Sequence, residues 1–366
     1  MAKKSICHVT SVHNWDDIRI FKKQCVSLAK YFDKVHLVAP NGPNGTFNGV
    51  NVTCVENKYK GRIKRILYFR KQIINAALKL DADIYQFHDP ELLSFVSYFK
   101  RKGKIVIYDS HEDVPETILT KKWIPSKMIR KVISSIFDRF EKRIVRNCDG
   151  LISVLPEITN KFTCKHTETI YNYPIIQETK KNRAKSVTRL IYVGGLTRIR
   201  GIKDICEALN HLDSGYELML VGKWESEEFR NECHQVVKDS GRLLDKGLVD
   251  FETCQTYLET ADIGLAMLHK VPNYMNSLPI KAYEYAINQL PTLMSDIPYW
   301  EKEFKNFAVF TDPLNHQLIA ENIRSIKANY QDHLSNVLSF REKIIAGKNW
   351  SIEEQKLVVF YRKIIG

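Results

Sequence analysis

The chain has 366 residues, of which 44% are hydrophobic and 27% are charged, and its formal net charge is +13. This length predicts two domains of ordinary size, and the composition excludes a disordered or fibrous chain. The sequence offers no apolar run long enough for a membrane span and no signal-peptide pattern after Met1. The eight cysteines form no C-x-x-C pair and the eleven histidines lack zinc-type spacing, so we expect cytoplasmic, reduced thiols and no protein-held metal.

The first half of the chain alternates short apolar runs with amphipathic segments, which predicts an α/β domain with a parallel sheet. Strands are predicted at residues 5–12, 34–39, 51–56, 82–88, 104–108, 150–154 and 167–171. Helices are predicted at residues 18–32, 58–79, 92–101 and 121–146.

Two of these predicted helices concentrate the positive charge. Residues 58–79 hold eight Lys or Arg and no acid, and residues 121–146 hold nine against Asp138 and Glu141. Both have apolar residues at helical spacing, so we expect apolar stripes that face the core and basic faces that look outward. Such faces suit an anionic membrane or a nucleic acid, and a merely solvated basic face is the alternative.

A polar run at residues 178–186 has no apolar periodicity and predicts the linker between two domains. After it, strands are predicted at residues 189–193, 217–221, 262–267 and 291–295, and helices at 202–212 and 225–238. Ser351 and Glu354 have the spacing of a capping box, which predicts a last helix. The expected domains are therefore 1–178 and 186–345, with a helix at 351–366 able to pack back on the first.

The turn after Val193 is a candidate phosphate site. Gly194 and Gly195 allow a ligand to approach the backbone, and Arg198 and Arg200 precede a predicted helix. The turn is not the G-x-G-x-x-G of dinucleotide sites, and the chain has no Walker-type G-K-[ST], which argues against NAD and ATP. A plain strand–turn–helix is the alternative.

Residues 277–286 combine a proline-containing loop, a helix start and one carboxylate, Glu284, before the strand at 291–295. In a parallel sheet this order places the loop at the carboxyl edge, where free backbone N–H groups bind anions and a carboxylate can hold a sugar hydroxyl pair. An amphipathic core helix with an exposed Glu is the alternative interpretation.

Polar residues also end two neighbouring strands of the first half. His88 follows one strand and His111 follows the next, and acidic residues accompany both. Because the carboxyl ends of consecutive parallel strands meet at one edge, we expect both histidines in a ligand crevice. The polar loop at residues 12–23, which carries Asp17 and Arg19, is expected beside them. A single strand-end histidine is more often structural, but two at neighbouring ends favour a site.

These segments resemble the retaining glycosyltransferases of family 4, whose donor-binding segment reads roughly S-x-P-x-K-x-x-E-Y-x-A. Residues 194–201 resemble that family's diphosphate segment, Lys246-Gly247 resembles its turn beside the nucleotide base, and residues 1–178 resemble the acceptor domain of its bacterial surface-polysaccharide branch. The resemblance covers most of residues 189–300 in the right order. It implies the GT-B fold, in which two Rossmann-like domains with parallel sheets face each other across a central cleft.

The resemblance also implies roles for individual residues. Arg200 is expected to stabilise the leaving diphosphate, and Glu284 to hold the ribose. Asn276 stands where the family has the first Glu of an E-x(7)-E pair, which lies near the transferred sugar. In this chain the role of that Glu passes to Asn276 or to backbone N–H groups at Ser277 and Leu278. The donor-binding set is Gly194, Gly195, Arg198, Arg200, Gly247, Asn276, Ser277, Leu278, Lys281 and Glu284.

On the acceptor side, the resemblance places His111 beside the transferred sugar and makes it catalytic together with Arg200 and Glu284. Asp17, Arg19 and His88 complete the acceptor-side set, and Arg19 is the candidate to meet the diphosphate from this domain.

The implied activity is that of a metal-independent hexosyltransferase without cofactor, which transfers a sugar from a nucleotide-sugar donor to a lipid-linked glycan or an oligosaccharide with retention. UDP donors are favoured over GDP donors. The expected setting is bacterial capsule, O-antigen or exopolysaccharide synthesis, with the protein cytoplasmic and peripheral on the inner face of the cell membrane. A sugar-nucleotide epimerase of the same fold and a non-catalytic partner subunit stay open. A nucleic-acid-binding protein would use the charge, but no RNA- or DNA-binding signature is present.

Overall fold

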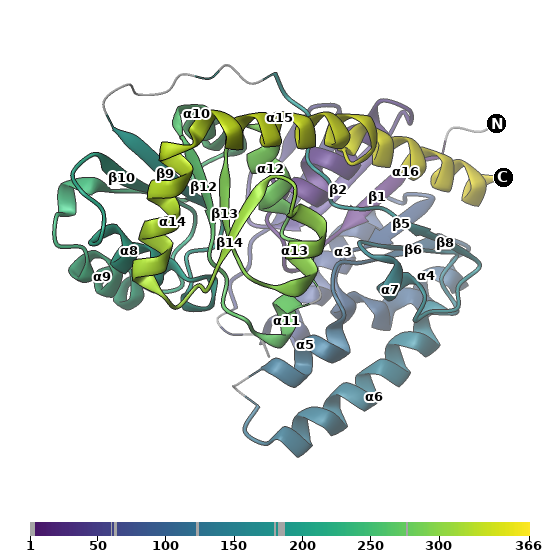
Figure 1. Cartoon of the computed structure of the whole chain (residues 1–366). Helices are drawn as coiled ribbons and strands as arrows, with labels where there is room; N and C mark the ends of the chain where they lie inside the picture. Colours follow the sequence, from purple (N-terminus) through teal and green to yellow (C-terminus); the bar gives the residue numbers. More distant parts are fainter. Residues whose placement is uncertain are drawn as a thin grey trace. The chain divides into compact units, whose positions relative to one another are not determined.

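The computed structural model describes residues 4–59, 61, 64–121, 124–178, 181, 187–275 and 277–366. The chain forms two compact units, one of Met1–Asn172 with Trp350–Gly366 and the other of Tyr173–Asn349 (Figure 1). It therefore passes from the first unit to the second at Asn172 and returns at Trp350. Most of the polar run expected as the linker, namely residues 179, 180 and 182–186, lies outside the described residues.

An eight-stranded sheet forms the first unit, with strand order β3-β4-β2-β1-β5-β6-β7-β8. All neighbours pair in parallel except β3 and β4, which form an antiparallel hairpin. The order brings β1, β5 and β6 side by side, so their carboxyl ends lie together. The strands are β1 (Ile6–Val9), β2 (Val35–Pro40), β3 (Gly45–Phe47), β4 (Val50–Val55), β5 (Ile84–Phe87), β6 (Ile105–Ser110), β7 (Gly150–Ser153) and β8 (His166–Thr169).

Helices cover this sheet because their apolar faces pack against its buried side chains. Phe69, Ile73 and Ile74 join Tyr85 and Phe99 in one core cluster, for example. The helical segments are η1 (Ile18–Cys25), α1 (Val26–Ala29), η2 (Arg65–Phe69), α3 (Arg70–Lys79), η3 (Pro90–Phe95), α4 (Val96–Arg101), α5 (Val114–Thr120), α6 (Lys127–Val145), α7 (Pro156–Thr159) and α16 (Trp350–Ile365). Among these, η1 and η2 are π-helical, a form that is rare and often found near functional sites.

The last helix, α16, begins at Trp350 and not after Ser351. The Glu354 carboxylate does not close a capping box at that end. It accepts hydrogen bonds from Ser27 Oγ at 2.7 Å and from Lys30 Nζ at 2.8 Å, and the Trp350 Nε1 also donates to Ser27 Oγ at 2.9 Å. These contacts hold α16 against α1 within the first unit.

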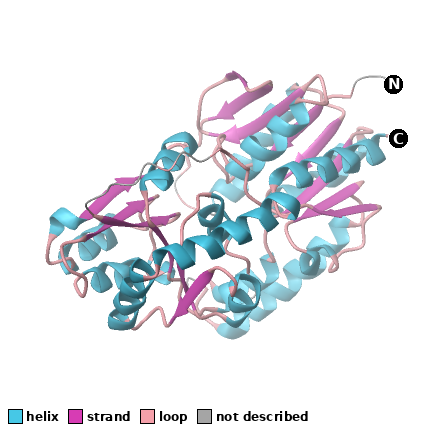
Figure 2. Ribbon diagram, turned by 45° about the horizontal axis from the view of Figure 1, so that its top comes forward, coloured by secondary structure: helices cyan, strands magenta, loops and turns pink. Residues whose placement is uncertain are grey.

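A six-stranded parallel sheet forms the second unit, with strand order β11-β10-β9-β12-β13-β14. Its strands are β9 (Thr188–Val193), β10 (Tyr216–Val221), β11 (Leu243–Gly247), β12 (Ile263–Ala266), β13 (Thr292–Ser295) and β14 (Ala308–Thr311). Its helical segments are η4 (Arg198–Arg200), α8 (Ile202–Leu209), α9 (Glu227–Val236), η5 (Ser240–Arg242), α10 (Phe251–Thr260), α11 (Pro272–Met275), α12 (Ile280–Ile287), α13 (Pro298–Phe304), α14 (His316–Ala328) and α15 (Tyr330–Gly347). Figure 2 shows helices packed along the strands of each unit.

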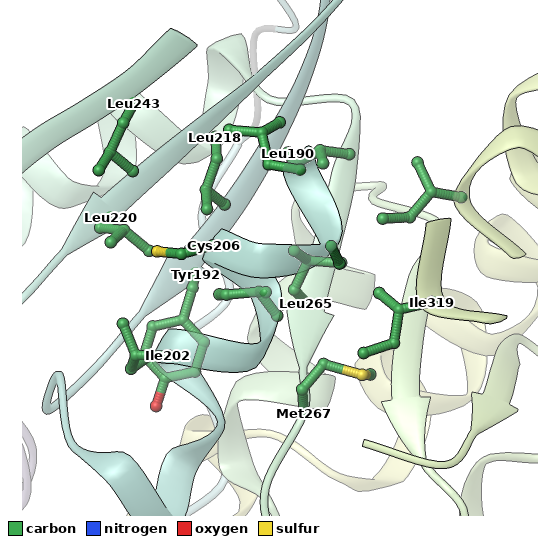
Figure 3. Close-up of a cluster of buried hydrophobic side chains, with 14 of the residues drawn as sticks. Leu190, Tyr192, Ile202, Cys206, Leu218, Leu220, Leu243, Leu265, Met267 and Ile319 are labelled. Carbon is green, nitrogen blue, oxygen red and sulfur yellow. The ribbon is translucent and has the colours of Figure 1, made fainter. Parts of the chain in front are cut away.

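The core of the second unit positions the end of β9. Leu190 and Tyr192 on β9 lie among side chains from α8, β10, β12 and α14 (Figure 3). All these side chains are almost fully buried, so the turn that follows Val193 starts from a rigid strand. Both units thus repeat the strand–helix alternation of the sequence around a parallel sheet.

The two basic stretches differ in what their apolar residues contact. In α3, Ile73, Ile74 and Ala77 are buried, as expected, whereas Leu67 of η2, expected on the same stripe, is 47% exposed. In α6 the expectation that the apolar stripe faces the core is wrong, since Ile136 on that stripe is 61% exposed. Among the described residues, no helix combines the length and apolar character needed to cross a bilayer.

Candidate functional site

Three glycines end adjacent strands at the carboxyl edge of the second sheet. Gly194, Gly222 and Gly247 follow β9 and β10 and end β11, and all three have positive φ values, +132°, +148° and +63°. The Gly222 N–H donates to the Gly247 carbonyl at 2.7 Å, and a Cβ on Gly222 would lie 1.8 Å from the Gly194 carbonyl oxygen. The absence of a side chain at Gly222 therefore allows the ends of β9 and β10 to approach each other, and the Cβ position of Gly247 has no atom within 4 Å.

Two cationic side chains converge on the first of these glycines. A Cβ built on Gly194 would lie 3.2 Å from an Arg200 guanidinium nitrogen and 3.3 Å from Lys281 Nζ. Arg200 is oriented by hydrogen bonds to the side chains of Tyr192 and Tyr274. Lys281 Nζ lies 3.8 Å from the centre of the Tyr192 ring. The positive charges thus come from two separate segments, η4 and the first turn of α12.

The Lys281 ammonium is buried without a hydrogen-bond partner within the part of the chain that the structure describes. The stem of the side chain keeps some solvent contact, but Nζ has essentially none. Burial, and then the positive charge of Arg200, lower the pKa of Lys281 well below 10.5, and the carboxylate of Glu284 opposes that change. A protonated amine held out of water beside a guanidinium is costly unless an anion joins them, which is why burial favours the neutral amine in the free protein. The pair is therefore a candidate anion site.

The remaining donor-side residues are distributed as follows. Ser277 and Leu278 are half-buried in the loop before α12, and the Ser277 carbonyl accepts a hydrogen bond from Trp300 Nε1 at 2.6 Å. Glu284 is half-buried on α12, one turn after Lys281. Gly195 adjoins the Arg200 guanidinium, and Gly247 lies two strands away from β9. Asn276 lies outside the described residues.

Arg198 does not join this group. Its guanidinium pairs with the carboxylate of Glu232 on α9 and lies 4.6 Å from the centre of the Phe229 ring. The side chain is exposed and directed toward α9. Arg200 and Lys281, not Arg198, therefore supply the charge at Gly194.

In the first unit, three imidazoles form a chain across the carboxyl ends of adjacent strands. His8 Nδ1 lies 2.9 Å from His88 Nε2, and His88 Nδ1 lies 3.2 Å from His111 Nε2. His8 belongs to β1, His88 follows β5 and His111 follows β6. Burial lowers the pKa values of His8 and His88, so both rings are neutral near pH 7.

Asp109 on β6 is the centre of this cluster. Its Oδ1 accepts from Arg19 at 2.8 Å, and its Oδ2 accepts from Gln24 Nε2 at 2.6 Å. Oδ2 also lies 3.2 Å from His88 Nδ1 and 3.1 Å from His111 Nε2. Against the effect of burial, the Arg19 guanidinium and then His111 hold the pKa of Asp109 well below 3.8.

The ionised Asp109 determines the tautomers of its neighbours. A carboxylate only accepts hydrogen bonds, so the His111 nitrogen that faces Asp109, Nε2, carries a proton. His88 Nδ1 faces the same carboxylate oxygen, so it also carries a proton, and His88 Nε2 accepts from His8 Nδ1–H. Both protons are directed at Asp109, so the contact between His88 and His111 is not itself a hydrogen bond. This assignment leaves an unprotonated nitrogen, His8 Nε2, as the buried atom without a partner. That is a smaller cost than a buried N–H without an acceptor.

His88 Nδ1, Asp109 Oδ2 and His111 Nε2 are also atoms of the kind that bind a metal, and all three lie within 4.8 Å of one another. However, Asp109 Oδ2 already accepts hydrogen bonds from Gln24 and Arg19, and the Arg19 charge would repel a dication. The hydrogen-bond network therefore accounts for the cluster without a metal.

The loop before η1 surrounds this cluster, and Asp17 is the N-cap of η1. Asp17 Oδ1 accepts from the Ile20 N–H at 2.9 Å, and its Oδ2 lies 3.2 Å from His13 Nδ1. Against the effect of burial, the hydrogen bond from His13 lowers the pKa of Asp17 to about 2. The His13 ring in turn lies 5.1 Å from the His111 ring. Asp17 thus positions the loop beside His111.

Arg19 is placed differently from the expectation that it meets a diphosphate. The side chain is 5% exposed and donates to Asp109 and to the Ile170 carbonyl, the latter at 3.0 Å. A guanidinium with these partners holds Asp109 in place. Its charge is compensated by the carboxylate of Asp109.

Asp109 and Gly222 are not among the predicted site residues, although a sequence pattern points to each of them. Asp109 and His111 are two residues apart, which places both on one face of an extended segment. Gly222 follows Val221 as Gly194 follows Val193, and these two valines pair in register between β10 and β9.

No family model matches the chain, and no curated protein matches its sequence. Solved structures do match it over almost the whole length. A sucrose-phosphate synthase from Thermosynechococcus elongatus has a TM-score of 0.75 at 15% identity, with 99% of each chain covered. HepE from Anabaena, in complex with UDP and glucose, has a TM-score of 0.69 at 12% identity, covering 98% of this chain and 99% of that one. A glycosyltransferase from Rickettsia africae has a TM-score of 0.67 at 13% identity, covering 100% and 99%. The chain therefore has the GT-B fold, as the sequence predicts.

Proposed function

We propose that the protein is a glycosyltransferase that uses a nucleotide-sugar donor, and that the donor diphosphate occupies the anion site of Arg200 and Lys281. The observation that carries this proposal is the convergence of a guanidinium and an unpartnered, buried ammonium on Gly194. A diphosphate supplies the negative charge that this pair lacks, and the glycine edge allows its oxygens to approach the backbone. The structures of HepE with UDP and with UDP-glucose support a UDP-sugar as the donor class.

In this proposal the catalytic task of the second unit is to stabilise the leaving group. Negative charge grows on the diphosphate as the bond between the sugar and the diphosphate breaks. The cationic groups of Arg200 and Lys281, already fixed at Gly194, therefore stabilise the transition state more than the ground state. Arg200 is held by two tyrosines and Lys281 by its burial, so neither needs to reorganise. Two cationic side chains can do this without a metal ion, which is the basis for proposing metal independence.

Further roles are assigned through the family resemblance. Glu284 holds the ribose hydroxyls, and His111 is the residue that the resemblance assigns to the transferred sugar. The sequence offers no obvious enzymatic nucleophile for a covalent intermediate. We therefore propose retention by front-face transfer, in which the leaving phosphate helps to deprotonate the acceptor hydroxyl.

The finer assignment is a hexosyltransferase of family 4 that acts on a lipid-linked glycan in bacterial capsule, O-antigen or exopolysaccharide synthesis. Its support is the resemblance of residues 189–300 and the concentration of basic residues in the first half of the chain. The protein would then work in the cytoplasm, peripherally on the inner face of the cell membrane.

The experiment is a thermal-shift screen with UDP- and GDP-sugars, followed by product analysis with and without a membrane lipid extract. We expect UDP release that persists in EDTA, and a labelled sugar in the lipid fraction when extract is present. UDP release with a free epimerised sugar and no transfer product would favour the epimerase. Nucleotide binding without any turnover would favour a non-catalytic subunit, and the absence of nucleotide binding would refute the proposed function.

A further inference from the structure

Helix α6 exposes an apolar stripe that no described element of the first unit covers. Of the twenty large hydrophobic residues exposed among the described residues, six lie on this one helix. Their exposed fractions range from 37% for Phe140 to 75% for Met128. The six are Met128, Ile129, Val132, Ile133, Ile136 and Phe140. A contiguous apolar surface of this kind marks a contact with a partner or a membrane.

The orientation of α6 is fixed by its packed face. Ser134 Oγ donates to the Pro115 carbonyl at 2.9 Å, and the Tyr108 hydroxyl donates to Glu141 at 3.0 Å. Ser134, Glu141 and Val145 are the buried residues of the helix, and they recur at helical spacing. Turning the apolar stripe inward would break these contacts and expose Glu141 in exchange for Ile136. The stripe is therefore directed outward by the fold itself.

Basic residues flank the stripe on the same helix. Lys131, Arg139, Lys142 and Arg146 follow one another at intervals of eight, three and four residues, so they form a row of their own beside the stripe. Asp138 offsets one member of this row, because it pairs with Lys142 at 2.9 Å, whereas Glu141 is buried, so Lys131, Arg139 and Arg146 carry the remaining charge. The helix thus presents an apolar stripe, a basic row and a packed face.

The charge of α6 decides what covers the stripe. A second copy packed stripe to stripe would bring two basic rows to a helix–helix distance of about 8–10 Å, which is about one Debye length, so the rows would repel. A helix at the boundary between the headgroups and the acyl chains of an anionic bilayer has acyl chains beside its apolar stripe and lipid phosphates beside its basic row. Charge complementarity therefore favours a lipid surface over self-association.

We propose that α6 is an interfacial helix, which inserts its apolar stripe into the headgroup–acyl boundary of an anionic bilayer while its basic row binds lipid phosphates. This inference rests on the proposed function in one respect, because it names the surface that would bring the enzyme to a lipid-linked acceptor. It differs from docking by basic faces alone, since the apolar contact persists when salt screens the charges.

The test is co-sedimentation of the full chain with vesicles of phosphatidylglycerol and phosphatidylcholine, at low salt and at about 1 M salt, where the Debye length is about 3 Å. The test variant is Ile133→Ser with Ile136→Ser, and the matched control is Leu338→Ser with Ile345→Ser, two exposed apolar residues of α15. We expect wild type and control to keep part of their binding at high salt. The test variant should bind about tenfold or more weakly per residue changed, since each loses the burial of an isoleucine side chain.

Equal high-salt binding of the test variant and wild type would overturn the proposal, and so would wild-type binding that disappears entirely with salt. A wild-type dimer that the test variant abolishes, seen by sedimentation velocity, would assign the stripe to a second copy instead. Melting temperature and UDP affinity are measured in parallel and should be unchanged, because all four substituted positions are exposed and none belongs to the anion site. Failure of UDP binding in the wild type would refute the proposed function without touching the vesicle result.

Discussion

Replacing Lys281 by methionine should stabilise the free protein and, at the same time, weaken its binding of UDP. The two effects share one cause. Lys281 Nζ has no hydrogen-bond partner among the described residues, and it lies beside Arg200. Methionine keeps most of the side-chain volume and removes the charge, so the cost of holding an ammonium out of water disappears together with its attraction for a phosphate.

The magnitudes follow from this environment. Replacing buried charged groups by apolar ones of similar volume is often stabilising by about 1–4 kcal/mol. Because the Lys281 stem keeps some solvent contact, we expect the lower end of that range, about 1–2 kcal/mol in the free energy of unfolding. A hydrogen bond to a charged group contributes about 1.5–3 kcal/mol, so the Kd for UDP should rise roughly 10- to 150-fold.

The pH dependence has a defined sign. The folded protein has a Lys281 pKa well below 10.5, while the unfolded chain keeps the proton up to that value. Between the two pKa values the unfolded state binds more protons, so the free energy of unfolding should rise with pH across that window. The methionine variant should lack this slope. Since a bound diphosphate favours the charged ammonium, UDP binding should be accompanied by proton uptake in the wild type only.

Urea denaturation gives the stability change, and titration calorimetry in two buffers of different ionisation enthalpy gives the Kd and the proton uptake. Lys343→Met is the matched control, because Lys343 is exposed on α15 in the same unit. It should change neither quantity. A Lys281→Met protein that is less stable than wild type, or that binds UDP equally well, would refute the argument that Lys281 is an uncompensated cation in an anion site.

Four further outcomes are expected. Glu284→Ala should raise the Kd of the donor by the equivalent of about 1.5–3 kcal/mol, and an unchanged Kd in calorimetry would remove Glu284 from the site. Arg200→Ala should lower kcat more than it raises KM, because diphosphate charge grows in the transition state; steady-state kinetics with an effect on KM alone would limit Arg200 to ground-state binding. EDTA should leave turnover intact, and complete loss restored by Mg²⁺ or Mn²⁺ would contradict metal independence. Asp109→Asn should lower the free energy of unfolding by about 3–5 kcal/mol, since it leaves the buried Arg19 without a counter-charge, and an unchanged denaturation midpoint would contradict that ion pair.

Most of the strands that the sequence predicts are buried on both faces, although the partly exposed β4 and β8 are also among them. The buried strands read as short apolar runs, as in β5 and β9, because a parallel sheet covered by helices leaves no polar face. The hairpin strand β3 escaped prediction since it is short and largely exposed, and its signal was the turn Asn48-Gly49, where both residues have positive φ. Asp245 and Lys246 interrupt the apolar pattern of β11, so its end was interpreted as a turn.

For the candidate site, the sequence predicts which strand ends meet but not which side chains pair. His88 Nδ1 and His111 Nε2 lie 3.2 Å apart because β5 and β6 are neighbouring strands. The alternation of strands and helices along the sequence predicts that these two strands are neighbours. The pairing of Arg19 with Asp109 joins residues 90 positions apart, and no local pattern encodes it. For α6, spacing places its apolar residues on one face, but whether a core, a bilayer or solvent covers that face depends on tertiary packing.

The return of the chain at Trp350 has a consequence for how the protein matures on the ribosome. The second unit is one continuous segment, Tyr173–Asn349, and can complete its sheet as soon as it emerges. The first unit is begun earlier but lacks α16, whose Tyr361 hydroxyl donates to Gln86 Oε1 at 2.5 Å in the buried layer against the sheet. At about 5–20 residues per second, synthesis of the intervening segment takes roughly 10–35 s. During that interval the face of the first sheet that α16 later covers stays exposed. We therefore expect the first unit to need protection by chaperones for longer than the second unit.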